Sequence, residues 1–204
     1  SFSTFNQTQM SNTDKPIEYL HIDPSVISKH IDTFHCSLPV DVECVTASCL
    51  VVLHKSLSLA KQHDRDYVAS RLSRSKVFLF ICQEARGKYE RKRIDNKHGF
   101  IQIGTQSKNG HYGCEIWISC RTKFTAKNGS VSRVAMNDIN VLHSSSRLLI
   151  ISICINGIYL YVISAHAPYH TSTNRAEVDE WWNSLSSYVS RCIPTGSRTI
   201  CVSD

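Results

Sequence analysis

The order of apolar runs and amphipathic segments predicts a mixed α/β (α+β) fold. Apolar runs rich in β-branched residues, typical of buried strands, alternate with only two stretches of helical periodicity. A strand–helix–strand order at each end predicts parallel crossovers, and the closely spaced strands between them predict antiparallel pairs. Three of the runs lead directly into an acid or an imidazole, namely Glu84, His166 and Asp204. We therefore expect polar groups to gather at one rim of a buried sheet.

Composition and charge limit the class of protein. A chain of 204 residues is long enough for one domain with a sizeable core, and its apolar fraction of 42% and charged fraction of 20% are those of an ordinary folded protein. The net charge of +6 favours an anionic partner such as a nucleic acid, a phosphorylated lipid or an anionic membrane surface. The alternative is a mildly basic globular protein without such a partner.

The cysteines and the hydropathy pattern indicate an intracellular protein. The nine cysteines are odd in number and include no CxxC pair, and five of them lie within apolar runs, where a thiol behaves as a small hydrophobic group: Cys44, Cys49, Cys82, Cys154 and Cys201. A reducing compartment, nuclear or cytoplasmic, is therefore expected rather than secretion. No apolar run approaches the roughly 18 residues of a membrane span, so we expect no membrane partner.

The N-terminal 40 residues differ from the rest of the chain. Residues 1–40 are polar and aperiodic and contain Pro16, Pro24 and Pro39, which favour extended or turn conformations. We interpret them as an arm or a linker, with the end of an upstream domain as the alternative. The sequence begins with Ser1 and not with an initiating Met, so we interpret Ser1 as a cut site or as a position within a longer protein. Residues 41–204 are expected to form the folded domain.

The first part of that domain predicts a strand–helix–strand unit. Val42–Leu53 has the apolar, β-branched composition of a buried strand. Ser58–Arg74 has apolar residues at helical spacing, and Val77–Gln83 is a nearly continuous apolar run of the kind that is buried on both faces.

Short strands and turns are predicted for the middle of the chain. A basic stretch, Arg86–Arg93, follows the second strand, and Lys123–Ser130 is a polar loop containing a glycine. The predicted strands are Phe100–Ile103, Gly113–Ser119, Val131–Leu142, Arg147–Ile155 and Ile158–Ala165. Asn156-Gly157 predicts a two-residue hairpin turn, because both residues tolerate positive φ.

Arg175–Arg191 has the clearest helical pattern in the chain. Its apolar residues recur at spacings of three and four and define one face: Val178, Trp181, Trp182, Leu185, Tyr188 and Val189. Asn174 and Glu177 resemble a capping box at its start. Pro194-Thr195-Gly196 breaks the helix before a last strand that leads into Asp204.

Several polar residues at the predicted rim are candidates for chemistry. Glu84 can hold a hard cation such as Mg²⁺, and the alternative is a solvated strand-end carboxylate. His166, followed by a strand-ending Pro168, can act as an acid or a base near neutral pH, although a lone histidine is more often structural. Arg86 can bind phosphate, and Tyr89 can orient phosphate or stack on a base, but both also suit a solvated surface.

Four segments together resemble the endonuclease/exonuclease/phosphatase superfamily. Ile81–Arg86 (ICQEAR) resembles its "LQET-R" strand end, and Gly113–Trp117 (GCEIW) resembles its "GG-A-W" strand. Ser164–Pro168 (SAHAP) looks like its "HAP" or "YAP" segment, and Cys201–Asp204 (CVSD) is similar to the beginning of its "GDFN" motif. The resemblance covers residues 41–204 and is greatest to the endonuclease domains of non-LTR retroelements that accompany a reverse transcriptase.

The resemblance implies a fold and an activity. The fold would be a β-sandwich of mixed strands flanked by helices, in four layers, with its second half incomplete in this chain. The activity would be phosphodiester hydrolysis with Mg²⁺, or Mn²⁺ in its place, and no small-molecule cofactor. Glu84 would be the metal ligand, His166 would contact the scissile phosphate, and Asp204 would orient or activate the attacking water.

This sequence also departs from the family pattern. Ser48 stands in Thr46-Ala47-Ser48 where relatives carry an Asn, and we assign Ser48, with Arg86 and Tyr89, to substrate binding. The Asn two residues after the family's Asp and the later "SDH" segment would lie beyond Asp204. The resemblance therefore leaves it open whether these 204 residues form an active enzyme.

Three functions follow from these observations. The first is a DNA-nicking endonuclease domain of a retroelement-like protein, with RNA as an alternative partner. The second is a phosphatase or sphingomyelinase-like phosphodiesterase acting on inositol phosphates or phospholipids. The third is a degenerate, non-catalytic remnant that binds nucleic acid, which Ser48 and the incomplete site favour.

Overall fold

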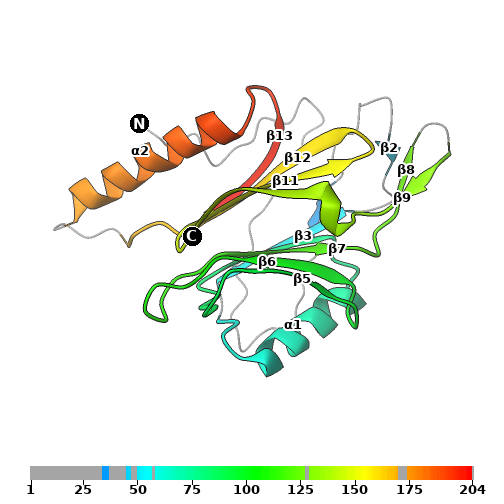
Figure 1. Cartoon of the computed structure of the whole chain (residues 1–204), viewed down its shortest axis with the longest axis horizontal. Coiled ribbons are helices and arrows are strands. Elements are labelled where there is room, and N and C mark those ends of the chain that lie inside the picture. Colours follow the sequence, from blue (N-terminus) through cyan, green and yellow to red (C-terminus); the bar gives the residue numbers. More distant parts are fainter. Residues whose placement is uncertain are drawn as a thin grey trace.

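Two β-sheets pack face to face, and one helix covers the outer side of each sheet (Figure 1). The computed structural model describes residues 34–36, 45–46, 50–56, 58–126, 129–169 and 174–203. Helix α1 (Gln62–Arg74) lies against the first sheet and helix α2 (Arg175–Cys192) against the second. The layers are therefore helix, sheet, sheet, helix, which confirms the predicted four-layer α+β sandwich.

The first sheet has six strands. Their spatial order is β1 (Phe34–Cys36), β3 (Leu50–Ser56), β4 (Leu79–Gln83), β7 (Glu115–Ser119), β6 (Phe100–Gly104) and β5 (Arg91–Asp95). Strands β3 and β4 are parallel and connected through α1, whereas the other neighbours are antiparallel. This arrangement confirms the predicted strand–helix–strand unit, with α1 beginning at Gln62 instead of Ser58.

The second sheet has four strands in sequence order: β10 (Ile139–Ser145), β11 (Leu148–Ile155), β12 (Ile158–Ala165) and β13 (Arg198–Ser203). The turn between β11 and β12 has Asn156 at φ 51° and Gly157 at φ 81°, which confirms the predicted hairpin. Strands β12 and β13 are parallel and connected through α2. Each sheet thus contains one parallel crossover whose helix lies on its outer face.

The main core fills the space between the sheets. Alternate residues of each strand point inward, for example Leu79 and Ile81 from β4 and Ile151 and Ile153 from β11. On the outer face of the first sheet, Val68 and Leu72 of α1 and Leu59 just before it form an apolar cluster with Phe80 and Trp117. On the outer face of the second sheet, Leu185 of α2 packs with Ile150 and Ile163, flanked by Trp181, Trp182, Tyr188 and Val189. The predicted apolar face of this helix is confirmed.

Three predicted elements are wrong in detail. The single strand predicted for Val42–Leu53 is β2 (Val45–Thr46) in one sheet and the beginning of β3 in another. The predicted loop Lys123–Ser130 contains β8 (Phe124–Ala126), which pairs with β2 and with β9 (Val131–Ser132). The strand predicted for Val131–Leu142 is interrupted by a 3₁₀ turn, η2 (Met136–Asp138), because the Asp138 carboxylate accepts a 2.7 Å hydrogen bond from the Ala135 N–H and closes the turn.

Other differences concern charged and terminal residues. The basic stretch Arg86–Arg93 includes the start of β5, an edge strand. The sequence analysis did not predict this strand, because its residues are mostly charged. Strand β1 lies within the stretch predicted to be an arm, and the division at residue 40 stays a prediction. The predicted capping box of α2 is wrong, because the Asn174 side chain makes no cap bond and donates to the Tyr169 carbonyl at 2.7 Å. Neither helix in the described part of the chain could cross a membrane.

The packing of α2 predicts the effect of shortening Leu185. This side chain is 9% exposed, so Leu185→Ala removes apolar contacts and leaves a cavity against the second sheet. We expect the free energy of unfolding, measured with urea, to fall by about 2 to 3 kcal/mol. Asn183→Ala on the exposed side of the same helix is the control and should change it by less than about 0.5 kcal/mol. Equal losses in the two variants would contradict the assigned face.

Candidate active site

The ends of β4, β12 and β13 meet across the sandwich. The buried Gln83 side-chain amide donates hydrogen bonds to Ser164 Oγ at 3.1 Å and to the Val202 carbonyl at 3.4 Å. Ser164 Oγ in turn donates to the Cys82 carbonyl at 3.4 Å. These polar contacts in an apolar interface fix how the strand ends face one another, because a buried polar group without a partner is costly.

Glu84 leaves the sheet directly after this contact. Its φ of 54° turns the chain out of the strand direction, and backbone hydrogen bonds from Ala85 N to Gly113 O (2.9 Å) and from Arg86 N to Tyr112 O (2.8 Å) hold the turn. The Glu84 carboxylate lies 3.4 Å from His166 Nε2 and 3.1 Å from Arg86 Nε. The structure therefore brings together three of the residues predicted from the sequence. Glu84 follows β4, His166 follows β12, and Arg86 lies in the turn.

His166 is supported by two residues that the sequence analysis missed. Its backbone N–H donates to the Arg147 carbonyl at 2.8 Å, and its ring meets the Tyr112 ring edge-on with centroids 5.4 Å apart. The Arg147 guanidinium lies 3.8 Å from the centroid of the Tyr112 ring, within cation–π distance. The only sequence signal was that Tyr112 directly precedes a predicted strand and Arg147 begins one, and their meeting with His166 depends on tertiary packing.

The other predicted site residues have different outcomes. Tyr89 is 73% exposed, and no described contact joins its side chain to Glu84 or His166. Ser48 and Asp204 lie outside the described residues. The strand that leads to Asp204 is described, and its Ser203 pairs with Ala165, the residue before His166.

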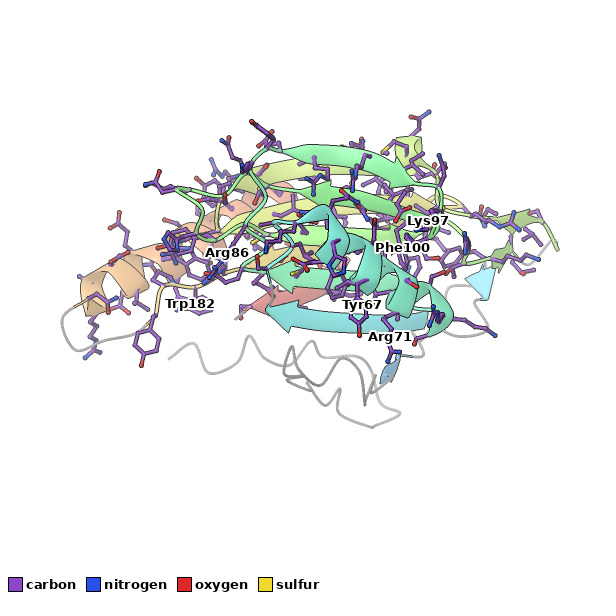
Figure 2. All side chains as sticks on the ribbon, turned by 90° about the horizontal axis from the view of Figure 1, so that it is seen from below. Tyr67, Arg71, Arg86, Lys97, Phe100 and Trp182 are labelled. Carbon is purple, nitrogen blue, oxygen red and sulfur yellow. The ribbon has the colours of Figure 1, made fainter. Side chains whose placement is uncertain are left out.

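Most of the basic stretch serves the fold. Arg91 approaches the buried Glu115 carboxylate at 3.4 Å, Lys92 donates to the Ile139 carbonyl at 2.8 Å, and Arg93 donates to Gln102 at 3.0 Å. Burial, and after it the charge of the neighbouring Arg65, lowers the pKa of Arg91. Arg86, half exposed, and Lys88, exposed, are the cations of this stretch that lie in the turn after Glu84. Figure 2 shows Arg86 well apart from Lys97, which lies in the turn after β5.

The donor groups fit one kind of metal ion. No group of three or more His, Cys, Asp or Glu side chains gathers in the described part of the chain. Glu84, with 24% of its side chain exposed at the rim, fits an ion such as Mg²⁺ that takes one or two protein carboxylates and keeps most of its waters. Glu84, His166 and Arg86 together place a carboxylate, an imidazole and a guanidinium at this rim, with the imidazole and the guanidinium each within 3.4 Å of the carboxylate.

A cysteine nucleophile is not part of this arrangement. Cys114 lies directly before β7 and is completely buried. Burial raises the pKa of its thiol to about 12, and a protonated thiol is a poor nucleophile. Cys114 therefore offers no reactive thiolate at this rim.

Comparison with solved structures identifies the fold. An AP endonuclease from Leishmania major superposes with a TM-score of 0.51 at 11% identity, over 88% of this chain and 61% of that one. The endonuclease domain of TRAS1, a telomere-specific non-LTR retrotransposon, gives a TM-score of 0.49 at 13% identity over 75% of this chain and 57% of that one. An AP endonuclease from Archaeoglobus fulgidus gives 0.47 at 18% identity over 73% and 55%. No family model and no protein of curated function matches the sequence.

The superposition on the Leishmania major AP endonuclease shows that this chain shares the fold of that protein, which is the fold expected from the resemblance. The chain spans between 55% and 61% of the length of the three structures described. The predicted resemblance is confirmed at the level of the fold.

The burial of Cys114 predicts its reactivity. At pH 8 we expect iodoacetamide to modify Cys114 at least roughly tenfold more slowly in the folded protein than in urea, because the thiol is buried and protonated. Peptide mass spectrometry measures this rate, and the partly buried Cys120 is the internal comparison. Modification of Cys114 at the same rate in both solvents would contradict its placement.

Proposed function

We propose that this chain is part of a metal-dependent phosphodiesterase domain that nicks DNA in a retroelement-like protein. The observation that carries the proposal is the 3.4 Å approach of Glu84 and His166 at the ends of β4 and β12, with Arg86 beside them. The superfamily fold supports a nuclease in general, and the retroelement character rests on the sequence motifs. A reverse transcriptase in the same protein is part of this proposal.

Each site residue has a proposed role. Glu84 would hold Mg²⁺, with Mn²⁺ as a substitute, and an ion bound there supplies Lewis-acid stabilisation of charge on the phosphate. His166 would hydrogen-bond a non-bridging oxygen of the scissile phosphate, in an orientation fixed by Tyr112. Asp204 would orient the attacking water and Ser48 would contact the substrate, as the resemblance implies.

Positive groups around the site support a polyanionic substrate. The net charge is +6, and Arg86 and Lys88 lie in the turn after Glu84. A hydrogen bond of 2.7 Å from Ser107 N to Gly87 O brings the exposed Lys108 next to the same turn. Contacts of this kind recognise phosphates without reading bases, so they suit DNA and also RNA. The six cysteines whose side chains the structure describes are free thiols, which supports an intracellular location, nuclear or cytoplasmic.

Removing the Glu84 carboxylate tests the assigned metal ligand. We expect Glu84→Gln to reduce Mg²⁺-dependent nicking of supercoiled plasmid by about a hundredfold or more, because the amide is a weak ligand for a hard cation. Glu90→Gln is the matched control: Glu90 lies six residues further on, is exposed and accepts a hydrogen bond from Ser144. It should keep nearly full activity. Unchanged nicking by the Glu84 variant would refute the assignment.

A degenerate binding remnant is the second candidate, favoured by Ser48 at the family's Asn position. It predicts DNA binding that weakens steeply with salt, because phosphate contacts release counterions, and no Mg²⁺-dependent cleavage. Lys88→Gln should then lower the slope of log affinity against log salt by about one unit. Plasmid nicking at a rate above that of the Glu84 variant would exclude the remnant. Phosphate release from inositol phosphates without nicking would favour the phosphatase alternative.

A further inference from the structure

A buried ionic cluster lies behind the turn that carries Glu84. The Glu115 carboxylate, 1% exposed, accepts two hydrogen bonds from the guanidinium of Arg65, which is 2% exposed. The same carboxylate accepts a 2.7 Å hydrogen bond from Trp117 Nε1 and lies 3.4 Å from Arg91. One carboxylate therefore joins helix α1, strand β7 and the start of β5.

The cluster is at the end of the first sheet where Glu84 lies. Glu115 is the first residue of β7 and pairs with Cys82, two residues before Glu84. A Cβ atom on Gly87 would lie 3.5 Å from Glu115 Oε1, so the carboxylate packs directly beneath the turn 84–87. A Cβ on Gly104 would come within 2.8 Å of Glu115 Cγ, so the glycine at the end of β6 makes room for this side chain.

The turn above the cluster has a conformation that its residues do not favour by themselves. Glu84 and Arg86 both have positive φ, 54° and 55°, which is unfavourable for residues with a Cβ. Such a conformation persists only where the surrounding structure determines it. The Glu84 carboxylate can keep its position at the rim only while the turn is held.

Each segment that holds the turn is anchored in the cluster. Leu59 N, just before α1, donates to Ala85 O at 2.9 Å, and Arg65 in the first turn of α1 binds Glu115. Ala85 N donates to Gly113 O at 2.9 Å, two residues before Glu115. The cluster thus fixes α1 and β7 relative to each other on the two sides of the turn.

We propose that the Arg65–Glu115–Arg91 cluster positions the Glu84 carboxylate for metal and phosphate. Glu115 and Arg65 touch no substrate; they act through the turn, and the metal part of this inference rests on the proposed function. A buried ion pair is a poor way to gain stability alone, since packed apolar residues of the same size often do as well. Its use here, beside Trp117 of the apolar cluster under α1, is explained by the geometry that it imposes.

The test compares two carboxylate-to-amide changes in the full chain. Glu115→Gln keeps the size of the side chain but removes the charge that holds two guanidiniums. Asp95→Asn is the matched control, because Asp95 is also in an ion pair, 2.7 Å from His98 Nδ1, but lies at the opposite end of β5 from Arg91. Figure 2 labels Arg86, two residues after Glu84, and Lys97, two residues after Asp95, and shows them well apart.

Two readouts do not require activity. We expect Glu115→Gln to speed hydrogen exchange of the Ala85 and Arg86 amides at least tenfold, and to weaken Mn²⁺ binding, measured by electron paramagnetic resonance, at least fivefold. Asp95→Asn should change neither. The proposal would be overturned if these two amides exchanged at the wild-type rate. It would also be overturned if their exchange rose only as much as that of amides throughout the core.

The result also separates this inference from the proposed function. If the wild-type protein binds no Mn²⁺ and nicks no DNA, the proposed function fails, and local exchange alone decides whether the cluster holds the turn. If Glu115→Gln does not fold, Arg65→Lys replaces it, because a lysine keeps the positive charge on α1 but cannot make both guanidinium hydrogen bonds to Glu115. Faster exchange at Ala85 and Arg86 in that variant supports the proposal, and unchanged exchange overturns it.

Discussion

The buried hydrogen bond between Gln83 and Ser164 sets the relation between the two sheets on which the site depends. Strand β4 of the first sheet and β12 of the second end at this contact, and the Gln83 amide also reaches the Val202 carbonyl of β13. Because these polar groups lie in an otherwise apolar interface, sliding one sheet over the other would leave them without partners. Glu84 follows directly on β4 and His166 follows directly on β12, so the same contact places both at one rim.

Two groups of buried polar side chains lie near that rim. On the sandwich side, Gln83 and Ser164 connect the strand ends, and on the helix side Arg65 and Glu115 connect α1 to β7. The turn that carries Glu84 lies between these two groups. Contacts with both sheets and with α1 therefore fix its conformation. Rigid strands and satisfied polar contacts are the means by which a fold holds reactive groups in a set geometry.

The sequence predicted what depends on local pattern, and it missed what depends on distant partners. Apolar runs and the Asn156-Gly157 turn were enough to predict β11 and β12, and strand ends were enough to bring Glu84 toward His166. The Arg65–Glu115 pair spans 50 residues, and neither residue stands in a pattern that marks it as buried. Strand β5 was not predicted, because its charged residues lack the apolar pattern of a buried strand. An edge strand can have charged side chains because one side of it faces solvent.

The proposed function places a divalent cation on Glu84, beside His166. Crystals of the protein grown with Mn²⁺ and measured at a wavelength where manganese scatters anomalously test this claim directly. We expect an anomalous peak within bonding distance of a Glu84 carboxylate oxygen in the wild-type protein and no peak there in Glu84→Gln. Manganese bound only at other carboxylates, with no peak beside Glu84, would contradict it.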